Sequence, residues 1–195
     1  GLLGASFSRL MSAERGFEAR NVLTADLALP GERYPDDVKR AQFHQALAAR
    51  LAQIPGTQSA GLINVLPLRG ESYVDMIRKQ GSTAPVWELP ITNYRFVNPG
   101  YFAAMGLPLV AGHDVASTDT ASSLPVVVIN EAMAERQWPG RSAVGRRIHL
   151  PGPSDVPTAL TVVGVAANAR QTDWTSPPED EAYVGVLYCG LMWCE

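Results

Sequence analysis

The sequence has little cysteine, little histidine and no long hydrophobic run, and each shortage excludes a class of protein. Two cysteines are too few for the disulfide framework of a small secreted domain. Three scattered histidines have no second ligand at metal-binding spacing, which disfavours a zinc site. No segment contains the ~18 to 20 consecutive apolar residues that cross a bilayer, so the sequence holds no complete membrane span.

Basic residues are also few, which excludes a nucleic-acid binder. Lys and Arg number 16 against 19 Asp and Glu, and the formal net charge is -3. No long basic run is present, so the electrostatic footprint of nucleic-acid binding is missing. Hydrophobic residues make up 46% and charged residues 18%, which is typical of a globular chain. A chain of 195 residues fits one domain, or one domain with an inserted lobe.

Motifs of common catalytic folds are absent as well. The sequence has no G-x-S-x-G nucleophile elbow, no phosphate-binding G-x-x-x-x-G-K-[ST] loop and no G-x-G-x-x-G after its first expected strand. His113 and Asp114 are the only adjacent pair that could begin a metal or acid-base site, and a solvent-exposed turn is the favoured interpretation. His44 is expected at the edge of an apolar helix stripe. His149 is expected to point away from the face that its two apolar neighbours bury.

Two further groups of residues invite a functional interpretation that the pattern does not favour. The acidic triplet Glu179–Glu181 follows two prolines, and its spacing does not match a calcium-binding loop, so we expect a solvated loop. The four tryptophans are scattered rather than spaced on one face. Core packing or capping is their expected role, and an aromatic binding platform is the alternative.

Hydrophobic periodicity predicts a βαβ arrangement in the first third of the chain. Residues 21–29 alternate apolar and polar side chains, which is typical of a half-buried strand. A helix is expected to open at residues 34–37, because proline and two aspartates suit a first turn. Its apolar stripe comprises Phe43, Leu47, Leu51 and Ile54. Residues 57–66 then predict a second apolar strand.

The remainder predicts short strands interspersed with short helices. Strands are expected at residues 74–78, 91–97, 107–110, 125–129, 147–150, 160–165 and 182–188, and short helices at 98–106 and 131–138. Asn130 is a good N-cap for the second of these helices. This order favours an α+β fold with one lobe inserted in another over a doubly wound sheet.

The two ends of the chain carry unusual segments. Residues 1–11 are mostly apolar and are followed by Glu14 and Arg15. They fit either the last turns of a truncated transmembrane helix or an amphipathic helix packed on the domain. At the other end, Cys189 and Cys194 form a C-x4-C pair that could close a local disulfide in an oxidising compartment.

Four ordered blocks resemble the periplasmic core domain of MacB-like ABC transporter permeases, in the MacB and FtsX superfamily. The blocks are GLLGASFSRL with RGFEARNVLTADLALPGERYPD, then RFVNPGYFAAMGLPLVAGHDV, VVVINEAMAERQWPGRSAVGRRIHL and TVVGVAANAR. The sequence departs from the family at residues 112–114, which read Gly-His-Asp where Gly-Arg-Asp is usual, and in its last seven residues.

The resemblance implies an organisation in two lobes. A juxtamembrane remnant of a transmembrane helix is expected at residues 1–16, a periplasmic core domain at 17–188 and an atypical tail at 189–195. Within the core domain, a βαβ-containing, ferredoxin-like lobe would occupy about 20–92 plus 158–188. A second, mixed α/β lobe would be inserted at about 93–157. The first and last residues would lie close together, because both must re-enter one membrane.

The resemblance also implies a role without catalysis. Such a domain is the extracytoplasmic part of an inner-membrane permease, and it couples membrane-helix motion to substrate expulsion in efflux, antimicrobial peptide export or lipoprotein export. The chain would need no cofactor and no metal, because a separate cytoplasmic ATPase uses the ATP. Expected partners are the permease's own transmembrane helices, the ATPase subunit, a periplasmic adaptor and a second permease copy, and no nucleic acid.

Two other functions remain open from the residues. A free-standing periplasmic module could bind a ligand or peptide in an apolar groove between the lobes. A hydrolase built on His113 and Asp114 is a distant third, and it needs a nucleophile within hydrogen-bond reach of the His113 ring.

Overall fold

The computed structural model describes residues 17, 20–69, 72–116, 125–150, 158–170 and 176–186. Its helical elements are α2 (Asp37–Ala52), the 3-10 turn η1 (Val86–Glu88), α3 (Tyr101–Ala104) and α4 (Glu131–Gln137). Its strands are β1 (Tyr73–Met76), β2 (Arg78–Lys79), β3 (Ile91–Val97), β4 (Leu109–Gly112), β5 (Val126–Asn130), β6 (Arg147–Leu150), β7 (Thr158–Ala166) and β8 (Glu181–Gly185). The expected α+β class is confirmed, and none of the described helices is long and apolar enough to cross a membrane.

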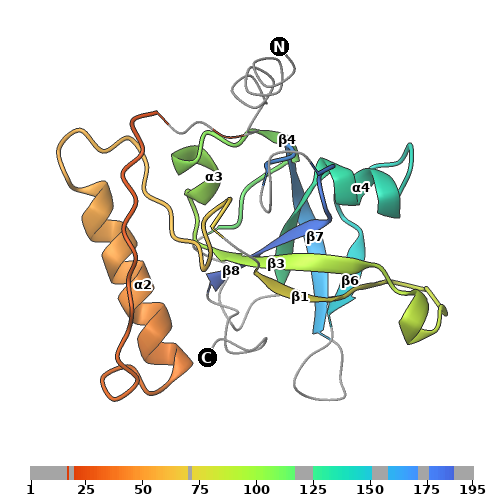
Figure 1. Ribbon diagram of the computed structural model, residues 1–195, viewed down its shortest axis with the longest axis horizontal. Coiled ribbons are helices and arrows are strands. Elements are labelled where there is room, and N and C mark those ends of the chain that lie inside the picture. The colour runs from red at the N-terminus through yellow and green to blue at the C-terminus, as the bar shows by residue number, and fades with distance from the viewer. Residues whose placement is uncertain are drawn as a thin grey trace, which may run out of the picture.

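The strands form one mixed sheet that closes on itself. Seven strands follow the order β1-β3-β8-β5-β7-β6-β2, and β4 pairs with β7 (Figure 1). The two ends of this order, β1 and β2, are separated in the chain only by Ile77. At this corner the Ile77 N–H donates to the Pro90 carbonyl at 3.0 Å, and the Gln80 N–H donates to the Arg147 carbonyl at 3.0 Å. Ile77 is fully buried, so one bent segment closes a small barrel that leaves few free strand edges.

The core lies in and around the central strands of this barrel. Every residue of β5 and β8 is buried. In β5 this follows from a continuous β-branched run, which favours a strand covered on both faces. Tyr101 and Phe102 of α3 pack against Tyr183 of β8, with ring centroids 6.1 Å and 5.0 Å apart.

Several sequence predictions are confirmed by these elements. The structure has strands at four of the predicted positions, which are residues 91–97, 125–129, 147–150 and 160–165. Both longer helices begin at the predicted polar residues. The Asp36 carboxylate accepts the Lys39 N–H at 2.8 Å before α2, and the Asn130 side chain accepts the Met133 N–H at 3.0 Å before α4.

The predicted βαβ unit in the first third is wrong. Residues 21–29 form no strand, and the Leu23 side chain is 96% exposed. Residues 57–66 contribute only an isolated bridge between Ile63 and Val97. The physical reason is that alternation makes a strand only where a neighbouring strand supplies hydrogen bonds, and no described strand pairs with residues 21–29.

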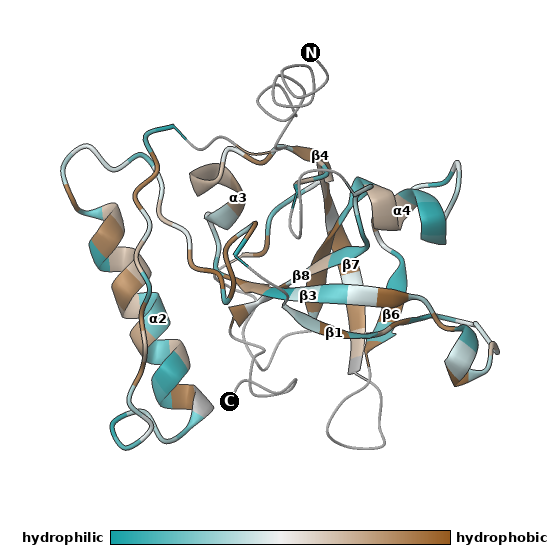
Figure 2. Ribbon diagram, in the orientation of Figure 1, coloured by the Kyte–Doolittle hydropathy of each residue, from teal (hydrophilic) through white to brown (hydrophobic). Residues whose placement is uncertain are grey.

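Helix α2 and the segments before and after it form an arm at one side of the barrel (Figure 1). Hydrophobic and hydrophilic bands alternate along α2 (Figure 2). The predicted stripe residues Phe43, Leu47 and Leu51 are only half-buried, and Ile54 is exposed. The Phe43 ring packs edge-on against Tyr34 with centroids 5.0 Å apart. We refer to residues 21–56 as the arm.

The expected division into two lobes is not confirmed. The barrel takes β5 and β6 from the expected inserted lobe of residues 93–157, and β7 and β8 from the segment beyond it. Residues 1–16 and 189–195 lie outside the described residues, together with Cys189 and Cys194. Their disulfide therefore stays a prediction, as does the closeness of the chain ends.

Candidate functional site

The acidic triplet does not form the solvated loop that the sequence predicted. Asp180 is 4% exposed and Glu181 is 1% exposed, because Glu181 begins the buried strand β8 and Asp180 directly precedes it. The Glu179 carboxylate accepts from the Asn93 amide at 2.9 Å. The Asp180 carboxylate pairs with Arg136 of α4, and the Glu181 carboxylate pairs with Arg95 of β3. Each acidic side chain thus has its own partner, which the local sequence could not reveal.

The innermost of these pairs joins two parallel strands. Arg95 Nε lies 3.0 Å from Glu181 Oε2, and the two side chains are 1% and 2% exposed. Arg95 Nη1 also donates to the Val65 carbonyl at 3.1 Å, so the guanidinium fixes the loop before β1 as well. Two charges buried at this depth are tolerated only when they are paired and hydrogen-bonded.

Asn130 connects this charged region to α4. Its side-chain oxygen accepts from the N–H of Met133 at 3.0 Å and from the N–H of Glu181 at 3.2 Å. Its amide nitrogen donates to the Glu179 carbonyl at 2.7 Å. One fully buried residue therefore joins the end of β5, the start of α4 and the start of β8. We refer to Arg95, Asn130, Arg136 and Glu179–Glu181 as the charged clasp.

One buried polar atom of the charged clasp, Oε1 of Glu181, has no hydrogen-bond partner among the described residues. The buried hydroxyl of Tyr101 on α3 has none among them either. Desolvation raises the pKa of Glu181 to about 7 from its ordinary value of 4.5, against the opposing effect of the Arg95 charge. The neighbouring carboxylates of Glu179 and Asp180 raise this pKa further. Burial likewise raises the pKa of the Tyr101 phenol.

This raised pKa predicts a pH-dependent stability. Between pH ~4.5 and ~7 the folded chain binds more protons at Glu181 than the unfolded chain does, so the free energy of unfolding falls as pH rises. Glu181→Gln removes this titration. We expect the stability of the wild type relative to this variant to fall by at most about 3 kcal/mol across that range, measured by urea denaturation. The exposed change Glu135→Gln on α4 is the control, and a pH-independent difference for Glu181→Gln would contradict the assignment.

The turn at residues 112–114 fixes the position of α3. Asp114 Oδ2 accepts the Gly100 N–H at 3.0 Å, at the residue that precedes α3. Burial raises the pKa of Asp114, and its hydrogen bonds to backbone N–H groups lower it in part. The two residues between which this bond forms are 14 apart in sequence. The bond therefore holds the turn after β4 against the start of α3.

His113 and Asp114 do not form a catalytic pair in this structure. His113 is exposed, as expected for a turn, and its Nδ1 lies 2.8 Å from the Asp114 carbonyl oxygen rather than from the carboxylate. No nucleophile among the described residues is hydrogen-bonded to the His113 ring. The hydrolase hypothesis therefore lacks the contact that it needs.

The other histidines follow their sequence predictions more closely. His44 is half-buried on α2, and burial lowers its pKa. His149 lies between the buried residues Ile148 and Leu150 of β6 and is itself only half-buried, as its alternation predicted. Across the described ranges, no three His, Cys, Asp or Glu side chains come together in a way that could hold a metal ion.

Solved structures resemble this fold at low sequence identity. The periplasmic region of MacB from Actinobacillus actinomycetemcomitans shows a TM-score of 0.51 and 16% identity. The match covers 74% of this chain and 56% of that one. The extracellular domain of the noncanonic ABC-type transporter YknZ from Gram-positive bacteria shows a TM-score of 0.44 and 17% identity, over 73% of this chain and 62% of that one. The chain thus spans between half and two thirds of the length of these relatives.

The sequence match to a family is more extensive than these structural likenesses. No curated protein matches the chain. Residues 3–186 match the family described as the MacB-like periplasmic core domain. This range includes the arm, the barrel and the charged clasp, and it contains all but the first two residues of the four blocks that carried the resemblance. The chain belongs to the family of MacB-like periplasmic core domains.

Proposed function

We propose that this chain is the extracytoplasmic core domain of an ABC-type permease, in which it couples the motion of membrane helices to substrate expulsion and to partner binding. The family match over residues 3–186 carries this proposal. The relatives described as periplasmic and extracellular regions support an extracytoplasmic position for this domain. A separate cytoplasmic ATPase supplies the energy, and this domain performs no chemistry.

The construction of the barrel supports a mechanical role. Its closure at Ile77 leaves few free edges, and the charged clasp ties β3, β5, β8 and α4 together with buried hydrogen bonds. A displacement applied to one element is therefore transmitted to the others, because packed and hydrogen-bonded elements move as a body. The arm is the less tightly packed part, since none of its described side chains is fully buried.

Efflux or antimicrobial peptide export and lipoprotein export are the transport types that such a domain serves. In each type the partners are the transmembrane helices of the full-length permease, the ATPase, a periplasmic adaptor and a second permease copy. The proposal requires that the surface of the domain be accessible from outside the inner membrane.

Accessibility can be measured with single cysteines in the full-length permease, expressed with its ATPase. All other cysteines are replaced by serine, and Glu32→Cys in the arm or Glu88→Cys in η1 introduces an exposed thiol. A membrane-impermeant maleimide should modify both thiols in cells whose inner membrane is intact. The control is a separate variant whose single cysteine is in the ATPase, and this thiol should react only after permeabilisation. Reaction of positions 32 and 88 only after permeabilisation would overturn the proposal.

A further inference from the structure

Four arginines lie in two segments that the sheet brings together. Arg78 is on β2, and its partner across the β2–β6 ladder is His149. Arg147 lies two residues before His149 on β6, so register places Arg78, Arg147 and His149 on one face of this ladder. Arg146 directly precedes β6, and Arg141 is in the loop that connects α4 to β6. We refer to Arg78, Arg141, Arg146 and Arg147 as the arginine group.

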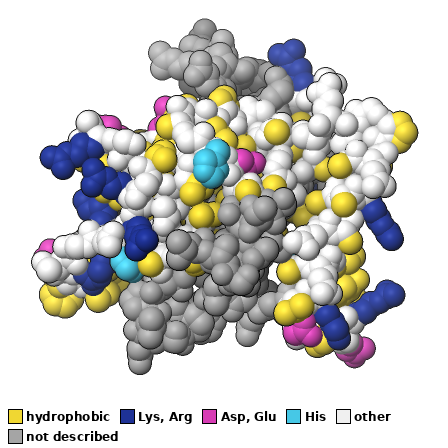
Figure 3. Space-filling view, turned by 180° about the vertical axis from the view of Figure 1, so that it is seen from behind, with side chains coloured by type: hydrophobic (Ala, Val, Ile, Leu, Met, Phe, Trp, Pro, Cys, Tyr) yellow, Lys and Arg dark blue, Asp and Glu magenta, His cyan; other side chains and the backbone are white. Residues whose placement is uncertain are grey.

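The arginine group has no acidic partners among the described residues. No ion pair joins any of the four to a described carboxylate, and Arg141, Arg146 and Arg147 are exposed. Arg78 Nη1 donates to the carbonyls of Ser82 at 3.3 Å and of Ala84 at 2.5 Å, so carbonyl dipoles rather than a carboxylate face its charge. Figure 3 shows Lys and Arg side chains gathered along the left side of that view, which is the side of α4 and η1. This concentration of positive charge contrasts with the net charge of -3 for the whole chain.

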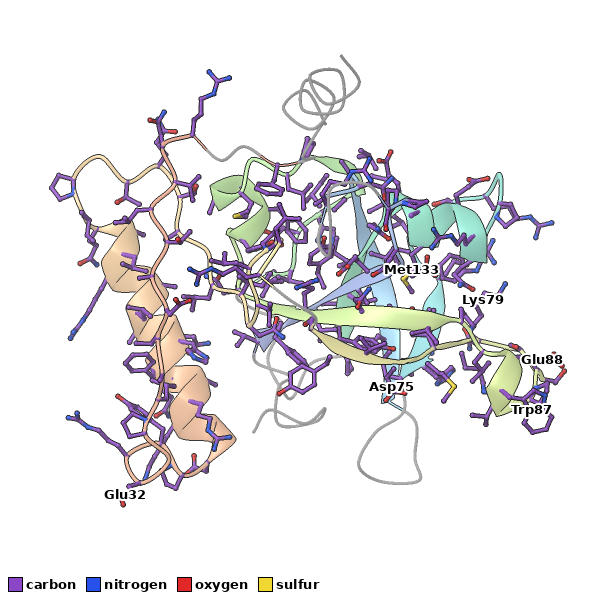
Figure 4. All side chains as sticks on the ribbon, in the orientation of Figure 1. Glu32, Asp75, Lys79, Trp87, Glu88 and Met133 are labelled. Carbon is purple, nitrogen blue, oxygen red and sulfur yellow. The ribbon has the colours of Figure 1, made fainter. Side chains whose placement is uncertain are left out.

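An exposed apolar group directly follows the loop that Arg78 of the arginine group binds. Trp87 is 84% exposed and Val86 is 52% exposed, so Trp87 does not have the core or capping role that the sequence predicted. Both belong to η1, which follows the loop that Arg78 binds. Figure 4 shows Trp87 and Glu88 at the outer end of η1, pointing away from the barrel. A tryptophan exposed to this degree is unusual, because its ring offers a large apolar area.

We infer that Val86, Trp87 and the arginine group form a docking surface for a protein partner that presents acidic side chains around an apolar pocket. Tryptophan and arginine are the residues most enriched among those that dominate binding energy at protein interfaces. A guanidinium binds a carboxylate through two parallel hydrogen bonds, which fixes orientation as well as affinity. The inference deepens the partner-binding part of the proposed function and rests on it.

The charges favour a protein partner over an anionic membrane surface. Glu88 is adjacent to Trp87, so a protein partner can place its acidic side chains opposite the arginine group and away from Glu88, whereas anionic headgroups would surround an inserted Trp87 ring together with this carboxylate. The net charge of -3 also opposes the approach of the whole domain to a negatively charged bilayer. At physiological salt, charges more than ~8 Å apart are largely screened from one another. An acidic patch on a protein partner therefore responds to the arginine group that it contacts rather than to the net charge of the whole domain.

The test uses the 195-residue chain and a short synthetic peptide in which glutamate alternates with leucine. Calorimetry or fluorescence anisotropy measures the affinity of the chain for this peptide, and we expect micromolar binding that weakens as salt is added. The double change Arg146→Glu with Arg147→Glu, and separately Trp87→Ala, should each weaken binding about tenfold or more. Arg50→Glu, an exposed arginine of the arm, is the matched control and should leave the affinity within about twofold.

Two further measurements distinguish the alternatives. A peptide with lysine in place of glutamate should not bind, and vesicles of phosphatidylglycerol and phosphatidylethanolamine should not retain the chain. Absence of binding to the glutamate peptide would overturn the inference, as would equal binding by the Arg146→Glu, Arg147→Glu variant. Retention by vesicles that depends on Trp87 would assign the surface to the membrane instead. These outcomes leave the cysteine-labelling test unaffected, so failure of the inference and failure of the proposed function are distinguishable.

Discussion

Replacing Arg95 by methionine is expected to lower the free energy of unfolding by about 3 to 5 kcal/mol. The change leaves the Glu181 carboxylate buried, at a side-chain exposure of 2%, without the only oppositely charged partner that it has among the described residues. It also removes the hydrogen bond from Arg95 to the Val65 carbonyl. Urea denaturation followed by tryptophan fluorescence at pH 8 measures the loss, because the Glu181 carboxylate is most ionised there.

Two controls separate this effect from a general loss of an ion pair. Arg69→Met breaks the exposed pair between Arg69 and Asp26, whose side chains are 58% and 81% exposed, and should cost about 0 to 1 kcal/mol. The double change Arg95→Met with Glu181→Leu removes both charges and should recover most of the lost stability. The explanation fails if Arg95→Met costs no more than Arg69→Met. If Arg95→Met does not fold, the folding of the double variant decides the question.

Replacing Gly112 by alanine is expected to cost about 3 kcal/mol or more, and to prevent stable folding in a marginal background. Gly112 has φ +70°, and an added Cβ atom would lie 2.0 Å from the carbonyl oxygen of Val163. That oxygen belongs to the backbone of β7, so it cannot move aside as a flexible side chain would. Thermal or urea unfolding of the variant measures the cost.

Gly140→Ala is the matched control for this prediction. Gly140 has φ +65°, but an added Cβ would meet nothing within 4 Å. It should therefore show only the conformational penalty of about 1 kcal/mol. If both variants lose the same amount of unfolding free energy, the close approach of β4 to β7 does not contribute to the cost of Gly112→Ala. Gly164 faces Gly112 across the β4–β7 ladder, and its added Cβ would lie 2.3 Å from the His113 carbonyl oxygen.

The elements that sequence predicted correctly are those whose cause is local. The β-branched run of β5 and the N-cap side chains of Asp36 and Asn130 act within a few residues, so the chain alone determines them. The alternation at residues 21–29 failed because a strand also needs a partner, and among the described residues no strand pairs with this segment.

The candidate site depends on contacts that are distant in sequence. Arg95 and Glu181 are 86 residues apart, and nothing in the sequence around Glu179–Glu181 shows that this acidic segment enters the core. The sheet closes at Ile77 because β3 pairs with β1 and β6 pairs with β2, and β1 and β2 are the two halves of one segment that bends at Ile77. The scattered tryptophans predict core packing or capping for Trp87, and only the fold shows that η1 projects from the barrel and leaves this side chain exposed.

The central claim is that this domain lies outside the inner membrane and moves when the ATPase works. The rate of cysteine labelling at positions 32 and 88 of the full-length permease, in cells with an intact inner membrane, tests it most directly. We predict reaction with the impermeant maleimide at both positions, and a different rate at one or both when the ATPase is inactivated by mutation. Labelling only after permeabilisation would contradict the position of the domain, and identical rates with active and inactive ATPase would contradict the coupling.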